Sequence, residues 1–368
     1  MELHELVRFG SDGSLPTTLD LADCAGANEH LDVVAWLQAT PVRQDALATW
    51  QGHPVLARLL TGPDSGLWLE REKEGRRQLA ALNLPHLSLL KEARTPLSGA
   101  WQLYDATEDL QNVEVAWRPL LDEPPLTEAQ QALLGEVLAM LGALHRQGLW
   151  PADPSLRHFI RSSGQIYLLD AGTLCRETPG TALSRGKVLV NLGRFFAQLP
   201  ARFEPVFEEL LVFYLLANGE HALPLEALLK EVNKARTLRL SEQLARLASS
   251  SPICNVKRNA NELRGVLRSV EEPLGNILAD PEAAWQQGTP VVAGNGASVR
   301  LETPVGPVQL RRYPAPSGWQ RLRPSAAWDA WLEGHRRYLC GYRFKRPLAV
   351  LERRLFGLRG VSYLVSED

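Results

Sequence analysis

Residues 144–175 contain the sequence feature that most constrains the fold of this chain. The segment joins the end of a helix with apolar periodicity to a turn at Gly148 and to two short β-type runs, 158–160 and 165–169. Ser162-Ser163-Gly164 separates these runs and predicts a hairpin. Asp153 precedes the hairpin and Asp170 follows it. Because a loop and the neighbouring strand end lie side by side, the two carboxylates can converge on one point.

The segments around this hairpin predict a β-rich part followed by a helical part. The runs 47–50 and 54–60 flank Gln51-Gly52 and predict another hairpin, followed by a helix over 70–82 and a strand over 101–104. Residues 127–147 carry apolar side chains at helical spacing, and the helical pattern returns over 187–250. We therefore expect an α+β fold, with a small β-rich lobe and a larger helical lobe.

The C-terminal third resembles a second copy of the small lobe. A strand, a turn at Gly294-Asn295-Gly296 and two further strands, 298–301 and 308–313, precede a helix over 326–340. An offset of 259 residues pairs Glu74-Gly75 with Glu333-Gly334 and, without gaps, Tyr104 with Tyr363 and Glu108-Asp109 with Glu367-Asp368. Such recurrence in register predicts an internal repeat.

Composition narrows the class of protein and its partners. With 45% hydrophobic and 22% charged residues, the 368-residue chain is of globular type. Forty Lys and Arg against 42 Asp and Glu give no overall electrostatic case for nucleic acid. No stretch approaches the roughly 20 apolar residues of a membrane-spanning helix. The N-terminus lacks a secretory pattern and the four cysteines form no Cys-x-x-Cys pair, so we expect a reduced, cytoplasmic protein.

The bracketed hairpin resembles the catalytic loop of the protein-kinase-like fold, and in particular of the lipopolysaccharide kinase family (Kdo/heptose kinases of the WaaP/InaA type). The matching positions are Leu144-His145-x-x-Gly148, Asp153, Phe159 and Leu169-Asp170. The resemblance covers most of residues 45–200 and 285–368. It implies a kinase that uses ATP and Mg²⁺ to phosphorylate a sugar hydroxyl, in which one carboxylate orients the hydroxyl and another holds the metal.

Carried over residue by residue, the resemblance implies roles for four positions. Asp153 is the catalytic base and Asp170 the Mg²⁺ ligand. Arg58 contacts the nucleotide phosphates and pairs with a helix carboxylate, which we expect to be Glu74, with Glu72 as the alternative.

The sequence also departs from the family pattern. His158 stands where the family has Asn as a second metal ligand, and imidazole is a poorer ligand for Mg²⁺. Arg58 in the first copy and Arg311 in the second stand where the family has Lys, a change that is not conservative at a tight site. No glycine-rich loop precedes Arg58.

Two functions remain open on these residues. The first is phosphoryl transfer to a sugar of the lipopolysaccharide core. The second is a pseudokinase, a scaffold that binds or regulates a partner kinase without catalysis. We expect an extension over 1–40, a kinase-like domain over 41–255 (small lobe to about 111) and a second small-lobe-like unit over 256–368. A basic cluster in this last unit predicts an anionic partner, and peripheral contact with the inner face of the inner membrane is a further expectation. The cluster comprises Arg311, Arg312, Arg321, Arg323, Arg336, Arg337, Lys345, Arg346, Arg353 and Arg354.

Overall fold

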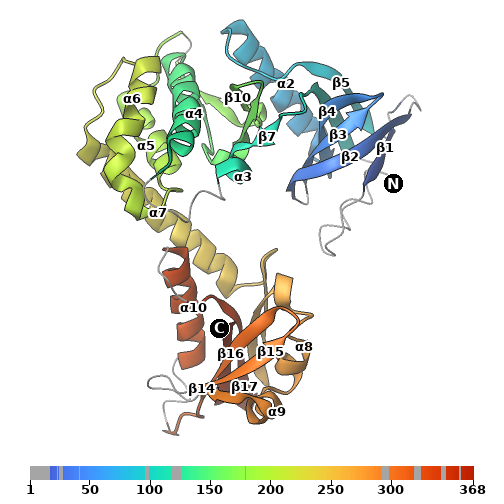
Figure 1. Ribbon diagram of the computed structural model, residues 1–368, viewed down its shortest axis with the longest axis vertical. Helices are drawn as coiled ribbons and strands as arrows, with labels where there is room; N and C mark the ends of the chain where they lie inside the picture. Colours follow the sequence, from blue (N-terminus) through green and yellow to red (C-terminus); the bar gives the residue numbers. More distant parts are fainter. Residues whose placement is uncertain are drawn as a thin grey trace. The chain divides into compact units, whose positions relative to one another are not determined.

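The computed structural model describes residues 17–22, 24, 28–40, 42–95, 99–117, 126–178, 180–291, 298–318, 325–340, 345–355 and 358–368. The chain divides into two compact units, residues 1–235 (unit 1) and 236–368 (unit 2) (Figure 1). We expected the division near residue 255. It lies instead within helix α7 (Leu225–Ala248), whose first half packs in unit 1 through Leu228 and Val232 and whose end packs in unit 2 through Leu247.

Unit 1 begins with a six-stranded antiparallel sheet in the order β1-β2-β3-β4-β6-β5. The expected hairpin forms between β3 and β4, because Gln51 and Gly52 adopt the positive φ angles, 51° and 80°, that tight β-hairpin turns need. The strands are β1 (Thr18–Ala22), β2 (Asn28–Ala39), β3 (Arg43–Trp50), β4 (His53–Thr61), β5 (Leu89–Thr95) and β6 (Gly99–Asp105).

The sequence led us to expect an N-terminal extension over residues 1–40. Residues 18–39 instead contribute two strands to the sheet. Strand β2 pairs along β3, and β1 pairs with β2. Leu19, Leu21 and Leu31 are fully buried in the core of this sheet. The β-type alternation of 28–39 is irregular because two register shifts interrupt the pairing of β2 with β3.

Helix α2 (Ser65–Ala81) follows β4 and packs against the sheet. Strand β4 is buried on both faces: Val55, Ala57 and Leu59 lie in the sheet core, and Leu60 packs with Leu69 of α2. Strand β4 is central in the sheet and covered on both faces, which explains why its sequence is a nearly continuous apolar run.

The second part of unit 1 is helical, and its largest core cluster is built from α4 (Glu128–Arg146), α5 (Arg185–Phe196), α6 (Phe207–Ala217) and the start of α7 (Figure 1). Thr127 begins α4 with a capping box, in which its side chain accepts from Gln130 N and the Gln130 side chain accepts from Thr127 N. The remaining elements are β7 (Gln111–Asn112), α3 (Val113–Trp117), β8 (Leu149–Pro151), β9 (Phe159–Ser162), β10 (Gln165–Leu168), β11 (Leu174–Arg176) and the 3₁₀ turns η2 (Leu156–His158), η3 (Ala171–Thr173) and η4 (Ala201–Val206).

The hairpin on which the sequence interpretation rests is present. Strands β9 and β10 pair antiparallel, and Ser163 and Gly164 occupy the turn with φ angles of 49° and 73°. Strand β7 adds to the other edge of β9, and β8 pairs with β11. The α+β class and the sequence of a β-rich lobe and a helical lobe are therefore confirmed for unit 1.

Unit 2 is a seven-stranded antiparallel sheet in the order β12-β13-β17-β18-β16-β15-β14, with α10 (Ala326–Leu339) against β17 and β18. Its other elements are β12 (Cys254–Arg258), β13 (Glu262–Leu267), η5 (Arg268–Val270), α8 (Gly275–Ala279), α9 (Pro281–Gln287), β14 (Thr289–Val291), β15 (Ser298–Thr303), β16 (Gly306–Tyr313), β17 (Pro347–Leu355) and β18 (Leu358–Glu367).

One strand order occurs in both units. In unit 1, three strands, a helix and two strands give β2-β3-β4-β6-β5; in unit 2 the same succession gives β14-β15-β16-β18-β17. A second small lobe stays a prediction, and the Gly294-Asn295-Gly296 turn lies outside the described residues.

Candidate functional site

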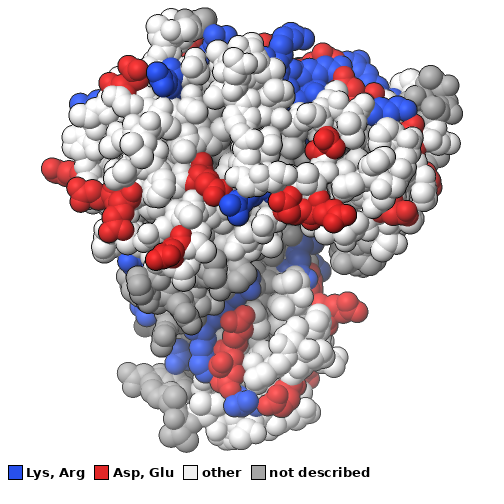
Figure 2. All heavy atoms as spheres, turned by 45° about the horizontal axis from the view of Figure 1, so that its top comes forward, with Lys and Arg blue, Asp and Glu red and all other residues white. Residues whose placement is uncertain are grey.

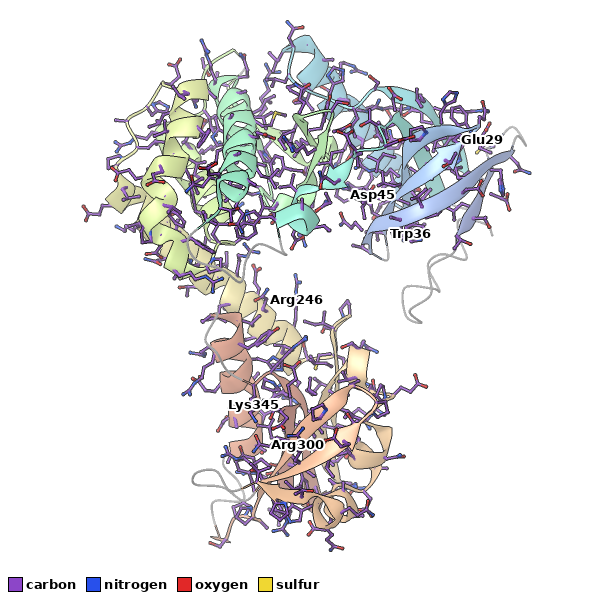
Figure 3. All side chains as sticks on the ribbon, in the orientation of Figure 1. Glu29, Trp36, Asp45, Arg246, Arg300 and Lys345 are labelled. Atoms are coloured by element: carbon purple, nitrogen blue, oxygen red, sulfur yellow. The ribbon has the colours of Figure 1, made fainter. Side chains whose placement is uncertain are left out.

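Arg58 lies at the centre of a buried network of charges in unit 1. Its side chain is 1% exposed, and each of its nitrogens is engaged. Nε donates to Asp45 Oδ1 at 2.8 Å, Nη1 lies 2.8 Å from Glu72 Oε2, and Nη2 donates to the Leu169 carbonyl. Asp45 lies directly opposite Arg58 in the pairing of β3 with β4, and Figure 3 labels Asp45.

The helix carboxylate that pairs with Arg58 is Glu72, the alternative, and our expectation of Glu74 was wrong. Glu72 belongs to the buried face of α2, with Leu69 and Leu79, whereas Glu74 is exposed and pairs with Arg77 at 2.8 Å. The spacing held the signal, because residues 69, 72 and 79 follow helical periodicity and residue 74 does not. Burial raises the pKa of Glu72 to about 7, against the opposing effect of Arg58.

Arg43, which the sequence interpretation missed, forms an ion pair with Asp170. Arg43 Nη1 lies 2.8 Å from Asp170 Oδ1, and Arg43 Nη2 lies 2.7 Å from Asp45 Oδ2. The Arg43 and Asp170 side chains are 12% and 10% exposed. Burial alone would raise the pKa of Asp170, but Arg43 and Arg58 hold it below its usual value. Asp170 is therefore half of an internal ion pair.

The network connects the two lobes of unit 1. Arg43 and Arg58 belong to the sheet, whereas Leu169 and Asp170 follow β10. Helix α2 also touches the turn η3, where a Cβ on Gly75 would lie 1.9 Å from the Ala171 carbonyl oxygen. Removing either arginine would leave buried carboxylates uncompensated, at a cost of several kcal/mol.

Asp153 lies on the loop after β8, 45% exposed at its side chain. Its Oδ1 accepts from Ser155 N and Ser155 Oγ, and its Oδ2 lies 2.7 Å from Arg157 Nη2 and 3.2 Å from His158 Nε2. Burial would raise the pKa of Asp153, but these contacts, that with His158 first, hold it well below its usual range. A carboxylate with so low a pKa is a weak general base near neutral pH.

Helix α5 positions this loop through side chains spaced three and four residues apart. Asn191 Nδ2 donates to the Pro151 carbonyl at 2.9 Å, and Arg194 Nη1 donates to the Ala152 carbonyl at 3.0 Å. Two residues after the end of α5, Gln198 Oε1 accepts from Leu156 N at 2.9 Å. Asn191 lies among apolar residues on the buried face of α5, and this was the sequence signal for a role in holding the loop.

His158 lies between the two aspartates that bracket the hairpin. The ring is 7% exposed, with Nε2 3.2 Å from Asp153 Oδ2 and Nδ1 3.6 Å from Asp170 Oδ2. The sequence interpretation thus correctly placed Asp153, His158 and Asp170 together. The His158 imidazole ring lies between the carboxylates of Asp153 and Asp170.

These side chains do not fit a magnesium ion with a nucleotide. Mg²⁺ needs oxygen ligands at about 2.0–2.1 Å in octahedral geometry, but one Asp170 oxygen is paired with Arg43 and the other faces His158. Within the described residues, no three His, Cys, Asp or Glu side chains are grouped to hold a metal. Arg58 likewise has its nitrogens committed to Asp45, Glu72 and Leu169.

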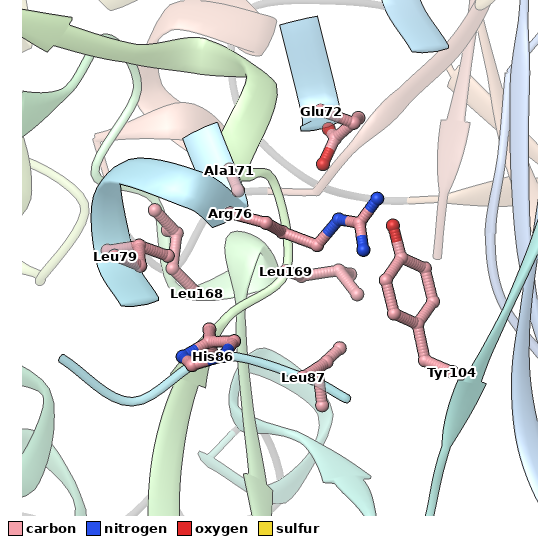
Figure 4. A pocket seen from close by; sticks show the side chains of 9 residues that line it. All are labelled: Glu72, Arg76, Leu79, His86, Leu87, Tyr104, Leu168, Leu169 and Ala171. Carbon is pink, nitrogen blue, oxygen red and sulfur yellow. The ribbon is translucent and has the colours of Figure 1, made fainter. Parts of the chain in front are cut away.

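A cavity of about 10 Å³, the size of one water molecule, lies between α2 and β6. Figure 4 shows the Arg76 guanidinium directed between Glu72 and Tyr104 in this cavity, and its Cζ lies 5.4 Å from the Tyr104 ring centroid. The cavity is lined by Glu72, Arg76, Leu79, His86, Leu87, Tyr104, Leu168, Leu169 and Ala171.

The basic cluster of unit 2 is partly neutralised. Arg312 pairs with Glu282, and Arg336 and Arg337 share Glu333. Lys345 and Arg300 both pair with Asp368; Figure 3 labels these two basic residues. Arg321 and Arg323 lie outside the described residues, and an anionic partner stays a prediction.

Arg311 is not the positional counterpart of Arg58. Arg58 faces Gln102 across the sheet, and the 259-residue offset takes Gln102 to Val361. Arg311 instead faces Leu364, three residues further along β18.

Comparison with known proteins gives distant structural similarity only. No family model and no curated protein matches the sequence. Among solved structures, "WaaP in complex with acyl carrier protein" matches at 14% identity and a TM-score of 0.38, over 55% of this chain and 88% of that chain. Vaccinia related kinase 3 matches at 12% identity and a TM-score of 0.36, over 69% of this chain and 82% of that chain. None of the helices in the described residues has the length and apolar character to cross a membrane.

Proposed function

We propose that unit 1 is a kinase-like module that does not transfer phosphoryl groups and acts as a scaffold or regulator of a partner protein. One observation carries this proposal: the Arg43 guanidinium occupies the carboxylate of Asp170, the position at which the family resemblance implies Mg²⁺. The Arg58 contacts with Asp45 and with the Leu169 carbonyl support it, because they engage the guanidinium nitrogens that the Glu72 pair leaves over.

Loss of the metal position would remove most phosphoryl transfer. The charge that develops on the transferred group is stabilised chiefly by bound metal and fixed cations. In this chain the fixed cations neutralise carboxylates of the chain itself. The active-kinase alternative, with a sugar hydroxyl as acceptor, requires Arg43 to leave Asp170 when Mg²⁺ and ATP bind.

Calorimetry with Mg²⁺ and ATP tests the proposal on the full chain. We expect no binding heat for the wild type at millimolar ATP. Arg43→Ala should free Asp170, so that Mg²⁺ raises the melting temperature of this variant and not that of the wild type. Adding Asp170→Asn to Arg43→Ala should abolish that rise.

The opposite results are equally clear. Tight binding of Mg²⁺ and ATP by the wild type, lost in Asp170→Asn, would overturn the non-catalytic proposal and support a kinase. Thermal unfolding of Arg43→Ala without Mg²⁺ shows whether the variant is folded. A folded Arg43→Ala that gains no response to Mg²⁺ would show that Arg43 is not what blocks the metal position.

A further inference from the structure

A groove lies between α2 and the segment that follows Asp170. Its volume is about 430 Å³, within the range of ligand-binding sites. One wall is α2, with Trp68 and Gly75, and the other is the segment after Asp170, with Ala171, Leu174 and Cys175. The lining surface is largely apolar, and its polar residues are Arg71, Glu74, Gln78 and Thr173.

The strand in this groove has an open edge. Strand β11 pairs with β8 alone in the described part of the chain. Ala152 N donates to the Thr173 carbonyl at 3.2 Å, and Glu177 N donates to the Gly148 carbonyl at 3.1 Å. Because hydrogen bonding alternates along an antiparallel pair, the peptide groups of Leu174 and Arg176 face away from β8.

These outward peptide groups can accept a further strand. The Leu174 N–H turns back to the Ala171 carbonyl, which leaves the Leu174 carbonyl and the Arg176 N–H and carbonyl on the open edge. An extended peptide that enters a groove between a helix and a strand edge binds through such main-chain groups, and its alternate side chains occupy the groove.

One cation on the groove has no carboxylate partner. Figure 2 shows basic side chains gathered over the part of unit 1 where α2 lies. Lys73 and Arg76 pair with Glu92, and Arg77 pairs with Glu74. Arg71 is exposed, and its Cζ lies 5.0 Å from the Trp68 ring centroid. Among the described residues, no carboxylate lies within ion-pair distance of it.

We propose that this groove binds an extended segment of a partner protein that carries an Asp or Glu next to apolar residues. The segment adds as a strand to the open edge of β11. An apolar side chain packs against Trp68 and Leu174, and the carboxylate pairs with Arg71. Neither Arg43 nor Asp170 lines the groove.

A peptide set tests this on the full chain by fluorescence anisotropy. The probes are fluorescein-labelled nonapeptides that alternate Val or Ile with Thr and carry one Glu at each position in turn. A matched set has Lys in place of Glu. A third set keeps the side chains of the tightest Glu peptide and N-methylates alternate backbone amides, which removes strand pairing alone.

We expect one register of the Glu set to bind, and the matched Lys peptide to bind about tenfold or more weakly, as for loss of a charge-assisted hydrogen bond. N-methylation on one alternate set of amides should abolish binding, and methylation on the other set should not. Arg71→Glu should reverse the preference between Glu and Lys. Arg77→Glu is the matched control, since Arg77 is exposed on α2 and does not line the groove.

Three results would overturn the proposal: no binding by any Glu peptide, equal weakening by Arg71→Glu and Arg77→Glu, or binding that survives both patterns of N-methylation. The last would mean a ligand held by side chains alone, such as a helix. Circular dichroism of both variants confirms that the exposed substitutions leave the fold intact. None of these results depends on Mg²⁺ or ATP, so failure here is distinguishable from failure of the proposed function.

Discussion

The Arg43 guanidinium on β3 lies 2.8 Å from the carboxylate of Asp170, 127 residues further along the chain. Both side chains are nearly buried, and Arg43 also binds Asp45, which in turn binds Arg58. The pair connects the sheet to the segment that follows β10 in unit 1. Its consequences for stability and pH dependence are measurable apart from any activity.

The two neighbouring glutamates of α2 should differ sharply in their effect on stability. Glu72→Ala leaves the buried Arg58 with one partner fewer and should lower the free energy of unfolding by about 3–5 kcal/mol. Glu74→Ala, at an exposed position, should change it by less than about 0.5 kcal/mol. Denaturant titration followed by hydrogen exchange of β4 amides would measure this in unit 1. Equal effects would contradict the Arg58–Glu72 pair.

Glu72 should also make unit 1 less stable as pH rises. Its pKa is about 7 in the folded chain against an ordinary 4.5, so the folded state holds the proton over a range in which the unfolded chain has lost it. The resulting stability is complete below pH 4.5 and is lost as pH rises through about 7.

The measurement is the difference in unfolding free energy between the wild type and Glu72→Gln across this pH range. Within it the difference should fall by at most about 1.4 kcal/mol per pH unit, the limit for one proton. The isosteric amide removes the titration and keeps the shape. A difference that stays flat would show that Glu72 is ionised throughout.

His145 should act in the opposite direction. The ring is fully buried between Tyr214 and Asn191, and burial lowers its pKa to about 4. The His145 ring is therefore protonated near pH 6.5 in the unfolded chain, whereas it stays neutral at that pH in the folded chain. This contribution to stability is present above pH 6.5 and is lost as pH falls to about 4.

Nuclear magnetic resonance of the His145 ring protons gives a direct check. Their chemical shifts should stay constant from pH 8 to pH 5 in the folded chain. The stability of the wild type relative to His145→Gln should rise over pH 4 to 6.5. A ring that titrates near pH 6.5 would contradict the buried placement.

Gly75 should tolerate no side chain. A Cβ there would lie 1.9 Å from the Ala171 carbonyl oxygen, so Gly75→Ala must push α2 away from η3. We expect a loss of about 1–3 kcal/mol, as for other overpacking substitutions. Gly66→Ala, in the first turn of the same helix, meets only the Arg94 side chain at 3.7 Å and should be neutral or mildly stabilising. Unfolding curves that rank the two variants the other way would contradict the contact.

The sequence by itself determined the elements whose causes are local. Two tight turns follow from Gly52 and Gly164, which accept positive φ. They form the hairpin that carries Arg58 and the hairpin that lies between Asp153 and Asp170. Thr127 and the apolar periodicity after it gave α4. The convergence of Asp153, His158 and Asp170 was also predictable, because one hairpin positions all three.

Only the tertiary structure decided what these residues do together. Strand β2 was missed because its irregular register disturbs the alternation that identifies strands. Glu72 and Glu74 differ in which side of α2 the sheet covers, and Arg43 meets Asp170 only after β3 and β10 are brought together. An ion pair between distant residues leaves no mark in local periodicity, since its energy depends on burial and separation alone. For that reason the sequence indicates a kinase-like hairpin, whereas only the fold shows that Arg43 forms an ion pair with Asp170.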